Sequence, residues 1–358
     1  MAEVPSEIPS GCRVEADGCD GLPLLIEPDG DTSAEFLADW LTHGRTWVRH
    51  RLAQNGAFLL RGFAIDSATD FQLVARAVDE ELKTEYLGTS PRTPIEGTSH
   101  VFSASELPSF YPIPQHAEMT FTTNPPRHLL FCCLTEPNPG GGETPLVDLR
   151  AVYRDLDPEV RERFEQGGLK IVRNYASPSA SWSFSPWQLK PWPDMFETHD
   201  RRAVEAKCRE QGFETRWSER GSLCITSTQA VSRLHKRTGQ AAWFNHAQVF
   251  HLSAGEGEYR RIFAMRPSLR HWVVWKLTAL LTALQKRFVK SQDRAMGCYR
   301  LDGSEIPDSD MEAVRDAIWR NLVVTPWHKG DVLVIDNHAV GHGRLPYSGQ
   351  RGIGVCWA

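Results

Sequence analysis

The chain has 358 residues, of which 41% are hydrophobic and 24% charged. This balance is typical of a globular protein with a sizeable core and excludes a wholly disordered chain. Forty Lys and Arg against 45 Asp and Glu give a net charge of −5. The basic excess of nucleic-acid-binding proteins is therefore missing, and we expect no nucleic-acid partner.

The cysteines and the first residues indicate a cytoplasmic location. The eight cysteines contain no CxxC pair, which favours reduced thiols over a disulfide framework or a zinc ribbon. The opening MAEVPSEIPS lacks the basic and apolar regions of a signal peptide. The most apolar stretch, 272–284, contains Lys276 and is too short to span a bilayer. We therefore expect no transmembrane segment.

Apolar periodicity and turn residues predict the elements of the N-terminal half. In chain order, these are a strand at 24–26, a helix over 34–54, a strand from 57, a helix over 67–82, a turn-rich segment over 88–124, a strand over 128–134, a Gly-rich turn at 140–145 and a helix over 155–166.

The C-terminal half begins with a loop over 176–198 that carries three tryptophans. The elements predicted after it are a helix over 199–211, strands at 214–217, 223–226 and 241–244, helices over 269–290 and 308–321, and strands at 331–337 and 351–358, separated by a turn. Many short strands with a few helices favour an all-β barrel or sandwich decorated by helices.

Three residues have the types of a metal site. His116 and Glu118 stand two apart in QHAEMTF, and strand residues two apart point to the same face. His342 follows the buried-strand pattern DVLVIDN. Two histidines and one carboxylate form the facial triad of non-haem Fe(II) oxygenases. A surface His/Glu pair also explains the HxE pattern by itself.

Two further residues are candidates for binding a carboxylate. Arg351 lies nine residues after His342, and a guanidinium can hold a carboxylate through two hydrogen bonds. Arg344 competes with it for this role, and a surface arginine near the C-terminus is the plainer explanation. Thr144 follows the turn GGG, which lacks the phosphate-loop pattern and is also explained as an ordinary β-turn.

Together these motifs resemble a known family. HAEMTF (116–121), GGGETPLVD (140–148), WFN (243–245), WHKGDVLVIDN (327–337) and HGRLPYSGQR (342–351) are similar, in the same order, to motifs of TauD/TfdA-like Fe(II)/2-oxoglutarate oxygenases. The resemblance is strongest to the group that contains clavaminate synthase and the syringomycin-biosynthesis hydroxylase. It implies a mainly β fold with flanking helices and a double-stranded β-helix (jelly roll, cupin-like) core.

The resemblance also implies a set of ligands. Fe(II) would be bound by His116, Glu118 and His342. The cosubstrate 2-oxoglutarate would chelate the iron and extend its distal carboxylate to Arg351 and Thr144, and O₂ would be the second cosubstrate. Glu118 argues against halogenase chemistry, which requires a small residue at that position.

The implied organisation has two parts. Residues 1–56 form an N-terminal segment and helix, and residues 57–358 form a single oxygenase domain with inserts at about 176–215 and 255–296. The second insert is longer than the corresponding family segment. Core packing or a lid is favoured for it over contact with a membrane.

We expect the protein to hydroxylate an unactivated C–H bond of an amino-acid-like intermediate, free or carrier-bound, in natural-product biosynthesis. A carrier protein is thus a possible partner. The candidate substrate contacts are Arg127, Arg173, Asn245, His246 and Arg344. The alternatives are desaturation, epoxidation or sulfonate-type oxidative cleavage at the same iron, a zinc hydrolase using the same three ligands, and a non-catalytic carrier-protein-binding module.

Overall fold

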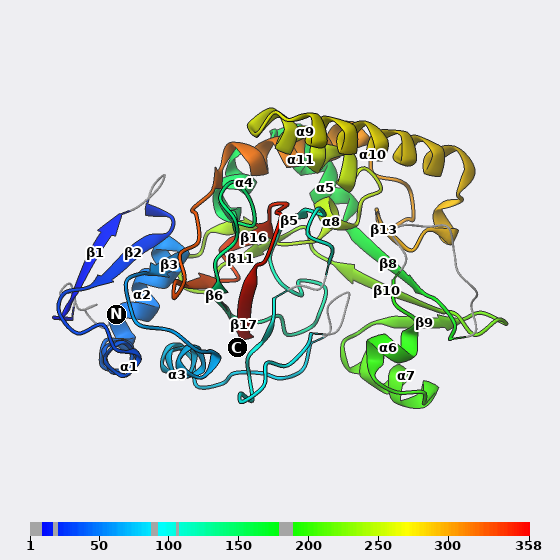
Figure 1. Ribbon diagram of the computed structural model, residues 1–358. Coiled ribbons are helices and arrows are strands. Elements are labelled where there is room, and N and C mark those ends of the chain that lie inside the picture. Colours follow the sequence, from blue (N-terminus) through cyan, green and yellow to red (C-terminus); the bar gives the residue numbers. More distant parts are fainter. Residues whose placement is uncertain (1–8, 17–20, 87–91, 105–106, 179–188) are drawn as a thin grey trace.

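A computed structural model of the protein describes residues 9–16, 21–86, 92–104, 107–178 and 189–358. In this part of the chain the strands form one seven-stranded sheet, two four-stranded sheets and one two-stranded pair. Helices cover the outside of the sheets, and the C-terminal strand runs through the middle of the molecule (Figure 1). The prediction of short strands decorated by helices is confirmed.

The large sheet is centred on a completely buried strand. Its order is β1 (Cys12–Ala16), β2 (Leu24–Pro28), β3 (Ala57–Leu60), β15 (Val332–Asp336), β6 (His128–Thr135), β17 (Gly352–Trp357) and β4 (Phe102–Ser103). Strand β15 pairs antiparallel with β3 and β6, and all five of its residues are buried. A continuous apolar run is what a strand covered on both faces requires.

The first four-stranded sheet faces the large one. Its order is β14 (Leu322–Val323), β7 (Leu146–Asp148), β16 (Val340–Arg344) and β5 (Ile113–His116). Phe131 and Leu333 of the large sheet and Leu146 and Val340 of the small one belong to a single buried cluster. The two sheets therefore enclose a common apolar layer, as in sandwiches.

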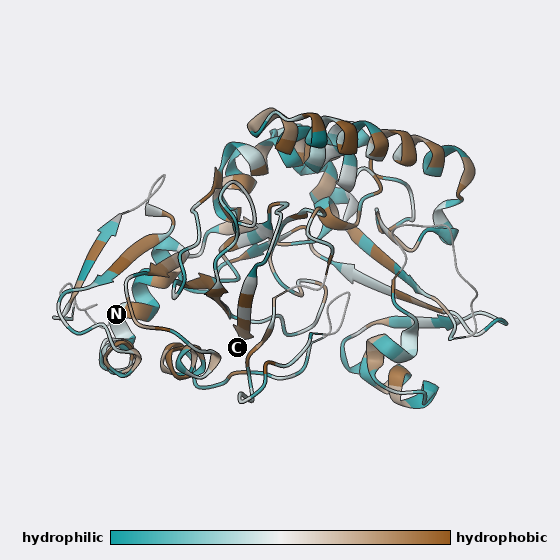
Figure 2. Cartoon of the chain, viewed as in Figure 1, coloured by the Kyte–Doolittle hydropathy of each residue, from teal (hydrophilic) through white to brown (hydrophobic). Residues whose placement is uncertain are grey.

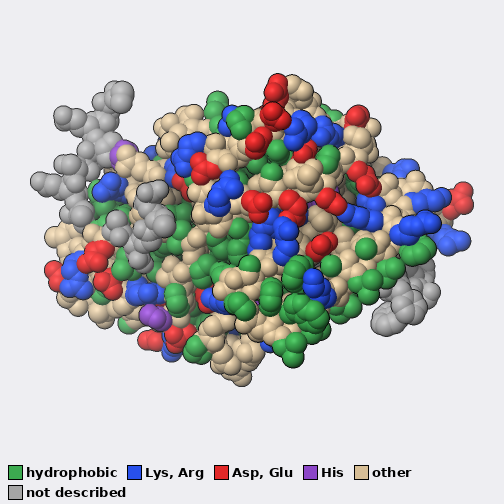
Figure 3. All heavy atoms as spheres, turned by 90° about the horizontal axis from the view of Figure 1, so that it is seen from above, with side chains coloured by type: hydrophobic (Ala, Val, Ile, Leu, Met, Phe, Trp, Pro, Cys, Tyr) green, Lys and Arg blue, Asp and Glu red, His purple; other side chains and the backbone are tan. Residues whose placement is uncertain are grey.

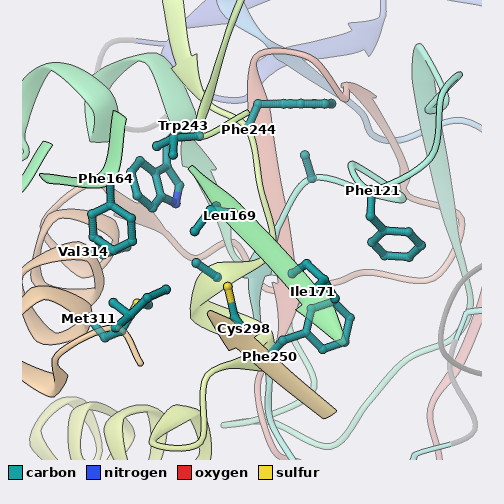
Figure 4. Packing of buried hydrophobic residues seen from close by; sticks show 14 of the residues in the cluster. Phe121, Phe164, Leu169, Ile171, Trp243, Phe244, Phe250, Cys298, Met311 and Val314 are labelled. Carbon is teal, nitrogen blue, oxygen red and sulfur yellow. The ribbon is translucent and has the colours of Figure 1, made fainter. Parts of the chain in front are cut away.

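The remaining strands form a third layer. Its order is β13 (Met296–Tyr299), β8 (Leu169–Tyr175), β10 (Leu223–Gln229) and β9 (Glu214–Trp217), with β11 (Ser232–Leu234) and β12 (Ala241–Trp243) paired separately. Alternate residues of β8 are buried. Figure 4 shows Leu169 of this strand next to Trp243 and Ile171 next to Phe250, within one buried cluster. This core fixes the third sheet against the helices.

Of the eleven α-helices in the described residues, six begin at a residue whose side chain caps the first turn. The helices are α1 (Ala34–His43), α2 (Arg45–Asn55), α3 (Ala68–Val78), α4 (Leu149–Asp155), α5 (Pro158–Gly167), α6 (Trp192–Phe196), α7 (Arg201–Glu210), α8 (Ala247–Phe250), α9 (Ala254–Met265), α10 (Leu269–Phe288) and α11 (Asp308–Arg320). Ser67 and Asp70 form a capping box at α3, and Asp157 caps α5 in front of Pro158. Such caps satisfy backbone N–H groups that the first helical turn leaves free.

Several predicted elements need correction. The helix predicted over 34–54 is two helices divided at Gly44, where a Cβ atom would lie only 2.8 Å from the Pro9 side chain and 3.0 Å from the Trp40 oxygen. The segment predicted as turns, 88–124, contains strands β4 and β5. Other elements that were not predicted are helices α4, α8 and α9 and strands β1, β7, β8, β11, β13 and β14. Strand β16 occupies residues predicted as a turn. The loop predicted over 176–198 contains the short helix α6, and its central part, 179–188, lies outside the described residues.

Helix α10 lies on the surface. It packs along α9 and buries only Thr278 and Thr282. Exposed apolar side chains run along its length: Leu269, Trp272, Val273, Leu277, Leu280, Leu284 and Phe288. Figure 2 shows hydrophobic residues spread over this helix, and Figure 3 shows hydrophobic side chains gathered on one side of the upper face. The prediction of core packing is therefore wrong for most of the apolar residues of α10. No helix in the described ranges has the length and apolarity needed to cross a membrane.

Candidate active site

Two strands and a turn bring three metal-ligand side chains together. His116 ends β5 and His342 lies in β16, and the two residues are directly opposite in the antiparallel pair. Glu118 follows β5 by two residues. Its Oε2 atom lies 3.9 Å from Nε2 of His116 and 3.8 Å from Nε2 of His342. All three side chains are at most 11% exposed, so the site is shielded from bulk water.

The backbone conformation between His116 and Glu118 differs from the single strand that we expected. Strand β5 ends at His116, so Glu118 is not on the same face of a strand. The chain turns instead, and Met119 takes a left-handed conformation with φ of 51°. Such a conformation is unusual for a residue with a side chain and is kept only where the surroundings hold it.

Asn337 supplies part of that constraint. Its Oδ1 accepts a hydrogen bond of 2.6 Å from the Glu118 backbone N–H, and its Nδ2 donates to the Glu118 carbonyl at 3.1 Å. The same Nδ2 donates to the Pro126 carbonyl at 2.8 Å. Asn337 is fully buried directly after β15. One amide thus fixes the backbone of the carboxylate ligand to the large sheet.

The three donors fit a divalent metal. Ligand atoms about 2.1 Å from an ion lie no more than about 4.2 Å apart, which the two distances to Glu118 satisfy. His116 Nδ1 lies 2.8 Å from the Pro114 carbonyl, so this nitrogen carries the proton and leaves Nε2 free to bind. Burial, reinforced by His116 and Arg92, lowers the pKa of His342 well below its usual value. A neutral imidazole is the form that binds metal.

A tyrosine and an arginine hold the other oxygen of the carboxylate. The Tyr86 hydroxyl donates to Oε1 of Glu118 at 3.1 Å, and Arg92 donates to the same hydroxyl at 3.0 Å. Arg92 also lies 3.7 Å from Oε2 of Glu118. Burial raises the pKa of Tyr86, so its hydroxyl remains a donor. This arrangement orients Glu118 for binding through one oxygen. The sequence analysis missed Tyr86.

A partly buried arginine and a buried threonine are in contact next to the small sheet. Arg351 Nη2 donates to the Thr144 hydroxyl at 3.3 Å, and Arg351 Nε donates to the Gly142 carbonyl at 2.7 Å. Thr144 stands two residues before Leu146, which pairs with His342. Thr144 therefore lies close to the strand that carries His342, and Arg351 reaches it from the start of β17 in the large sheet.

The Gly-rich turn makes room for the arginine. Gly142 has φ of +77°, and a Cβ atom there would lie 3.2 Å from the Arg351 side chain. Burial, with a smaller effect of Arg344, lowers the pKa of Arg351 to about 10. The guanidinium is still charged at neutral pH. A partly buried cation beside a hydroxyl, with no ion pair to any of the described residues, fits the distal carboxylate of a dicarboxylic keto acid.

Three of the other candidates are engaged within the protein. Arg127 forms ion pairs with Asp79 and Glu81. Arg344 donates to the carbonyls of Leu107, Pro108 and Tyr111. Asn245 bonds the backbone of Val231 and Ala247. These contacts favour structural roles for all three residues.

The remaining two candidates lie close to the metal ligands. The ring of His246 is 5.1 Å from that of His116, and its Nδ1 lies 2.6 Å from the Thr120 hydroxyl. Burial, with contributions from His116 and Arg173, lowers the pKa of His246 well below its usual value. Arg173 stacks on Phe121, three residues after Glu118. The structure thus separates these two residues from the other three.

Comparison with known proteins points to the same chemistry. The curated relatives include the dapdiamide synthesis protein DdaC of Enterobacter agglomerans, 29% identical over 94% of this chain and 91% of the relative. They also include a clavaminate synthase-like protein of Arabidopsis thaliana, 29% identical over 92% of this chain and 91% of that protein.

Solved structures share the fold. PvcB, described as an Fe, alpha-ketoglutarate dependent oxygenase from an isonitrile synthetic pathway, has a TM-score of 0.50 and 11% identity, with 97% of this chain and 91% of PvcB covered. A putative alpha-ketoglutarate-dependent taurine dioxygenase from Burkholderia xenovorans has a TM-score of 0.50 and 15% identity, with 97% and 92% covered.

The family model for the taurine catabolism dioxygenase TauD, TfdA family matches residues 26–357. This match spans nearly the whole chain, from the second strand of the large sheet to its C-terminal strand. The resemblance noted from the motifs is therefore confirmed. The His-Glu-His cluster is the one group of His, Cys, Asp and Glu in the described residues that is arranged to hold a metal. The chain belongs to the TauD/TfdA family of Fe(II)- and 2-oxoglutarate-dependent dioxygenases.

Proposed function

We propose that the protein hydroxylates an unactivated C–H bond of an amino-acid-like intermediate, free or carrier-bound, in natural-product biosynthesis. The reaction consumes the C–H substrate, 2-oxoglutarate and O₂, and it forms the alcohol, succinate and CO₂. In this proposal His116, Glu118 and His342 hold Fe(II), and Arg351 and Thr144 hold the distal carboxylate of 2-oxoglutarate.

One observation carries the proposal: the Arg351–Thr144 pair lies beside the strands that bring the three ligands together, because Leu146, two residues after Thr144, pairs with His342. A hydrolase that uses zinc needs the three ligands and has no use for a buried carboxylate site beside them. A keto diacid needs both, because one end chelates the metal while the other requires a cation. A binding module without turnover has no need to keep either site intact.

The scaffold explains how the residues stay in place. We propose that the two facing sheets are the double-stranded β-helix core and that residues 57–358 form the catalytic domain. Bound Fe(II) supplies the oxidising chemistry with 2-oxoglutarate and O₂. The protein's own part is to keep two neutral imidazoles and one anionic carboxylate at the metal and to exclude water by burial. Trp327 fixes the Thr144 hydroxyl through a hydrogen bond of 3.2 Å.

The proposed role in natural-product biosynthesis is supported by one of the relatives. DdaC carries the name of a dapdiamide synthesis protein and aligns over most of both chains. The intracellular setting rests on the thiols: the seven cysteines in the described residues are free, as expected in the cytoplasm.

Succinate formation tests the proposal. Purified protein with Fe(II), 2-oxoglutarate and O₂ is mixed with a panel of L-amino acids, and succinate and hydroxylated product are quantified. We expect a substrate that yields the two in equal amounts, and we expect His342→Ala to abolish both. His43→Ala is the matched control, since His43 is exposed on α1. Wild-type succinate formation by His342→Ala would overturn the metal assignment.

A further inference from the structure

Arg173 is a buried charge that forms no ion pair with any of the described residues. It lies on the inner face of β8 and is 2% exposed. Its guanidinium carbon is 4.5 Å from the centre of the Phe121 ring and 4.8 Å from that of Phe213. Nε and Nη2 are both buried and have no hydrogen-bond acceptor among the described residues. Burying a charge in this state is unfavourable unless something else pairs with it.

Neighbouring polar groups are in the same state. The Tyr175 hydroxyl, two residues along the same face of β8, lies next to Arg173 and is otherwise buried without a hydrogen-bond partner among the described residues. So is the Ser227 hydroxyl on β10, diagonally across the sheet from Arg173. Buried polar groups are satisfied in nearly all cases. Three unsatisfied donors on one face of one sheet therefore indicate that an acceptor-rich group is missing.

The free edge of the guanidinium identifies the chemistry of that group. Nε and Nη2 form one side of the planar fork, and this side matches the two oxygens of a carboxylate. The chain itself provides an example: Arg61 uses the same two nitrogens to bind the Asp331 carboxylate, at 3.0 and 2.7 Å. At Arg173 no described residue supplies the corresponding carboxylate.

Arg173 is connected to the metal ligands through aromatic contacts. The Phe121 ring on which it stacks is 5.1 Å from the His246 ring, and the His246 ring is 5.1 Å from that of His116. Phe121 also belongs to the turn that carries Glu118. This cation is distinct from Arg351, which contacts Thr144 and Gly142. The two arginines can therefore serve two different carboxylates.

We infer that Arg173, with the Tyr175 hydroxyl, binds a carboxylate of the substrate at the end remote from the oxidised C–H bond. The inference rests on the proposed function and narrows its substrate class to free acids. An amino acid tethered to a carrier protein is held as a thioester and lacks the α-carboxylate. Arg173 thus favours the free acid over the carrier-bound form.

The test compares acids with their uncharged derivatives. L-Amino acids and the matching C-terminal amides are assayed for succinate and product with wild type, Arg173→Gln and Arg173→Lys. We expect wild type to prefer the acid, and we expect Arg173→Gln to lower kcat/KM for the acid by about 30- to 1,000-fold, mostly through KM. The preference over the amide should disappear. Arg201→Gln is the control, because Arg201 stacks similarly on Trp217, at 4.6 Å, but is exposed.

A second readout does not depend on turnover. The visible band of the anaerobic Fe(II) protein with 2-oxoglutarate should form equally in wild type, Arg173→Gln and Arg173→Lys, which shows that the variants are folded. Adding the L-amino acid should change this band, and Arg173→Gln should need a far higher concentration of the L-amino acid than wild type for the same change. Arg173→Lys keeps the charge but loses the fork, so we expect an intermediate value.

The outcomes separate the two proposals. Equal use of acid and amide by wild type, an unchanged kcat/KM in Arg173→Gln, or turnover of the thioester alone would overturn the role of Arg173 and leave the proposed function standing. If wild type binds iron but shows no band with 2-oxoglutarate, the proposed function falls, and the inference falls with it.

Discussion

Replacing Asn337 with alanine should loosen the carboxylate ligand without touching the metal. The change removes all three hydrogen bonds of the amide and leaves the Glu118 N–H, the Glu118 carbonyl and the Pro126 carbonyl buried. A buried polar group without a partner costs about 1–3 kcal/mol, so we expect the free energy of unfolding to fall by about 3–5 kcal/mol. Loss of a group that orients a ligand typically weakens metal affinity by about 10- to 100-fold.

Two measurements follow these two effects. Urea unfolding gives the free energy of unfolding, and anaerobic titration with Fe(II) gives the metal affinity of the folded protein. Asn55→Ala is the control, because Asn55 makes one long hydrogen bond of 3.5 Å to the Gly21 carbonyl at the end of α2. We expect a loss below about 1 kcal/mol and unchanged metal affinity for that variant.

The aspartate variant sharpens the test. Asn337→Asp keeps an acceptor for the Glu118 N–H but places a carboxylate oxygen against the carbonyls of Glu118 and Pro126. We therefore expect it to be no more stable than Asn337→Ala. If Asn337→Ala binds Fe(II) as tightly as wild type and unfolds with the same free energy, then Asn337 does not fix the Glu118 backbone, and our reasoning is wrong.

Three further variants test other parts of the structure. Thr144→Val should raise the 2-oxoglutarate concentration at half-saturation about tenfold, because one hydrogen bond to the cosubstrate carboxylate is lost; an unchanged value would remove Thr144 from the site. Burial, with help from Arg315, lowers the pKa of His251 to about 4. The unfolded chain therefore binds more protons than the folded one between pH 6.5 and 4, and stability is lost as pH falls through this window. Urea unfolding at pH 7 and pH 5 should show a smaller loss for His251→Gln than for wild type, and equal losses would contradict the shift. On α10, Leu280→Gln should change the free energy of unfolding by less than about 0.5 kcal/mol, whereas Ile171→Ala in the core should cost about 2–5 kcal/mol; similar costs would mean that the α10 surface is covered.

The sequence was most informative where chemistry restricts the residue type. His116, Glu118, His342, Thr144 and Arg351 were all selected from motifs, and the structure places them on or beside the same small sheet. Their roles at the metal and the cosubstrate remain proposals for the experiments above. Metal and carboxylate sites accept few side chains, so such residues are visible in a single sequence.

Residues that act through long-range hydrogen bonds could not be predicted. Tyr86 reaches Glu118 across 32 positions and Asn337 across 219, and neither residue type indicates such a partner. The closing Asn of DVLVIDN was the one available signal for Asn337. Strand β8 was missed because the charged Arg173 stands at a position that faces inward and so interrupts the apolar alternation.

The α10 helix shows a different limit. Its apolar spacing correctly predicted a helix, but the same spacing serves a buried face and an exposed one. Core packing or a lid was favoured for the insert that contains this helix, yet Leu277 and Leu284 are exposed. What covers a helix is decided by the tertiary structure, which periodicity does not encode.

Binding of 2-oxoglutarate to the Fe(II) protein is the most direct test of the central claim. Under anaerobic conditions we expect titration with 2-oxoglutarate to produce a visible charge-transfer band that saturates at one equivalent per iron. In Arg351→Ala the band should require at least about 100-fold more 2-oxoglutarate, because a charged hydrogen-bonding partner is lost from a buried site. A wild-type protein that binds Fe(II) and develops no band, or an Arg351→Ala variant that saturates at the wild-type concentration, would contradict the account.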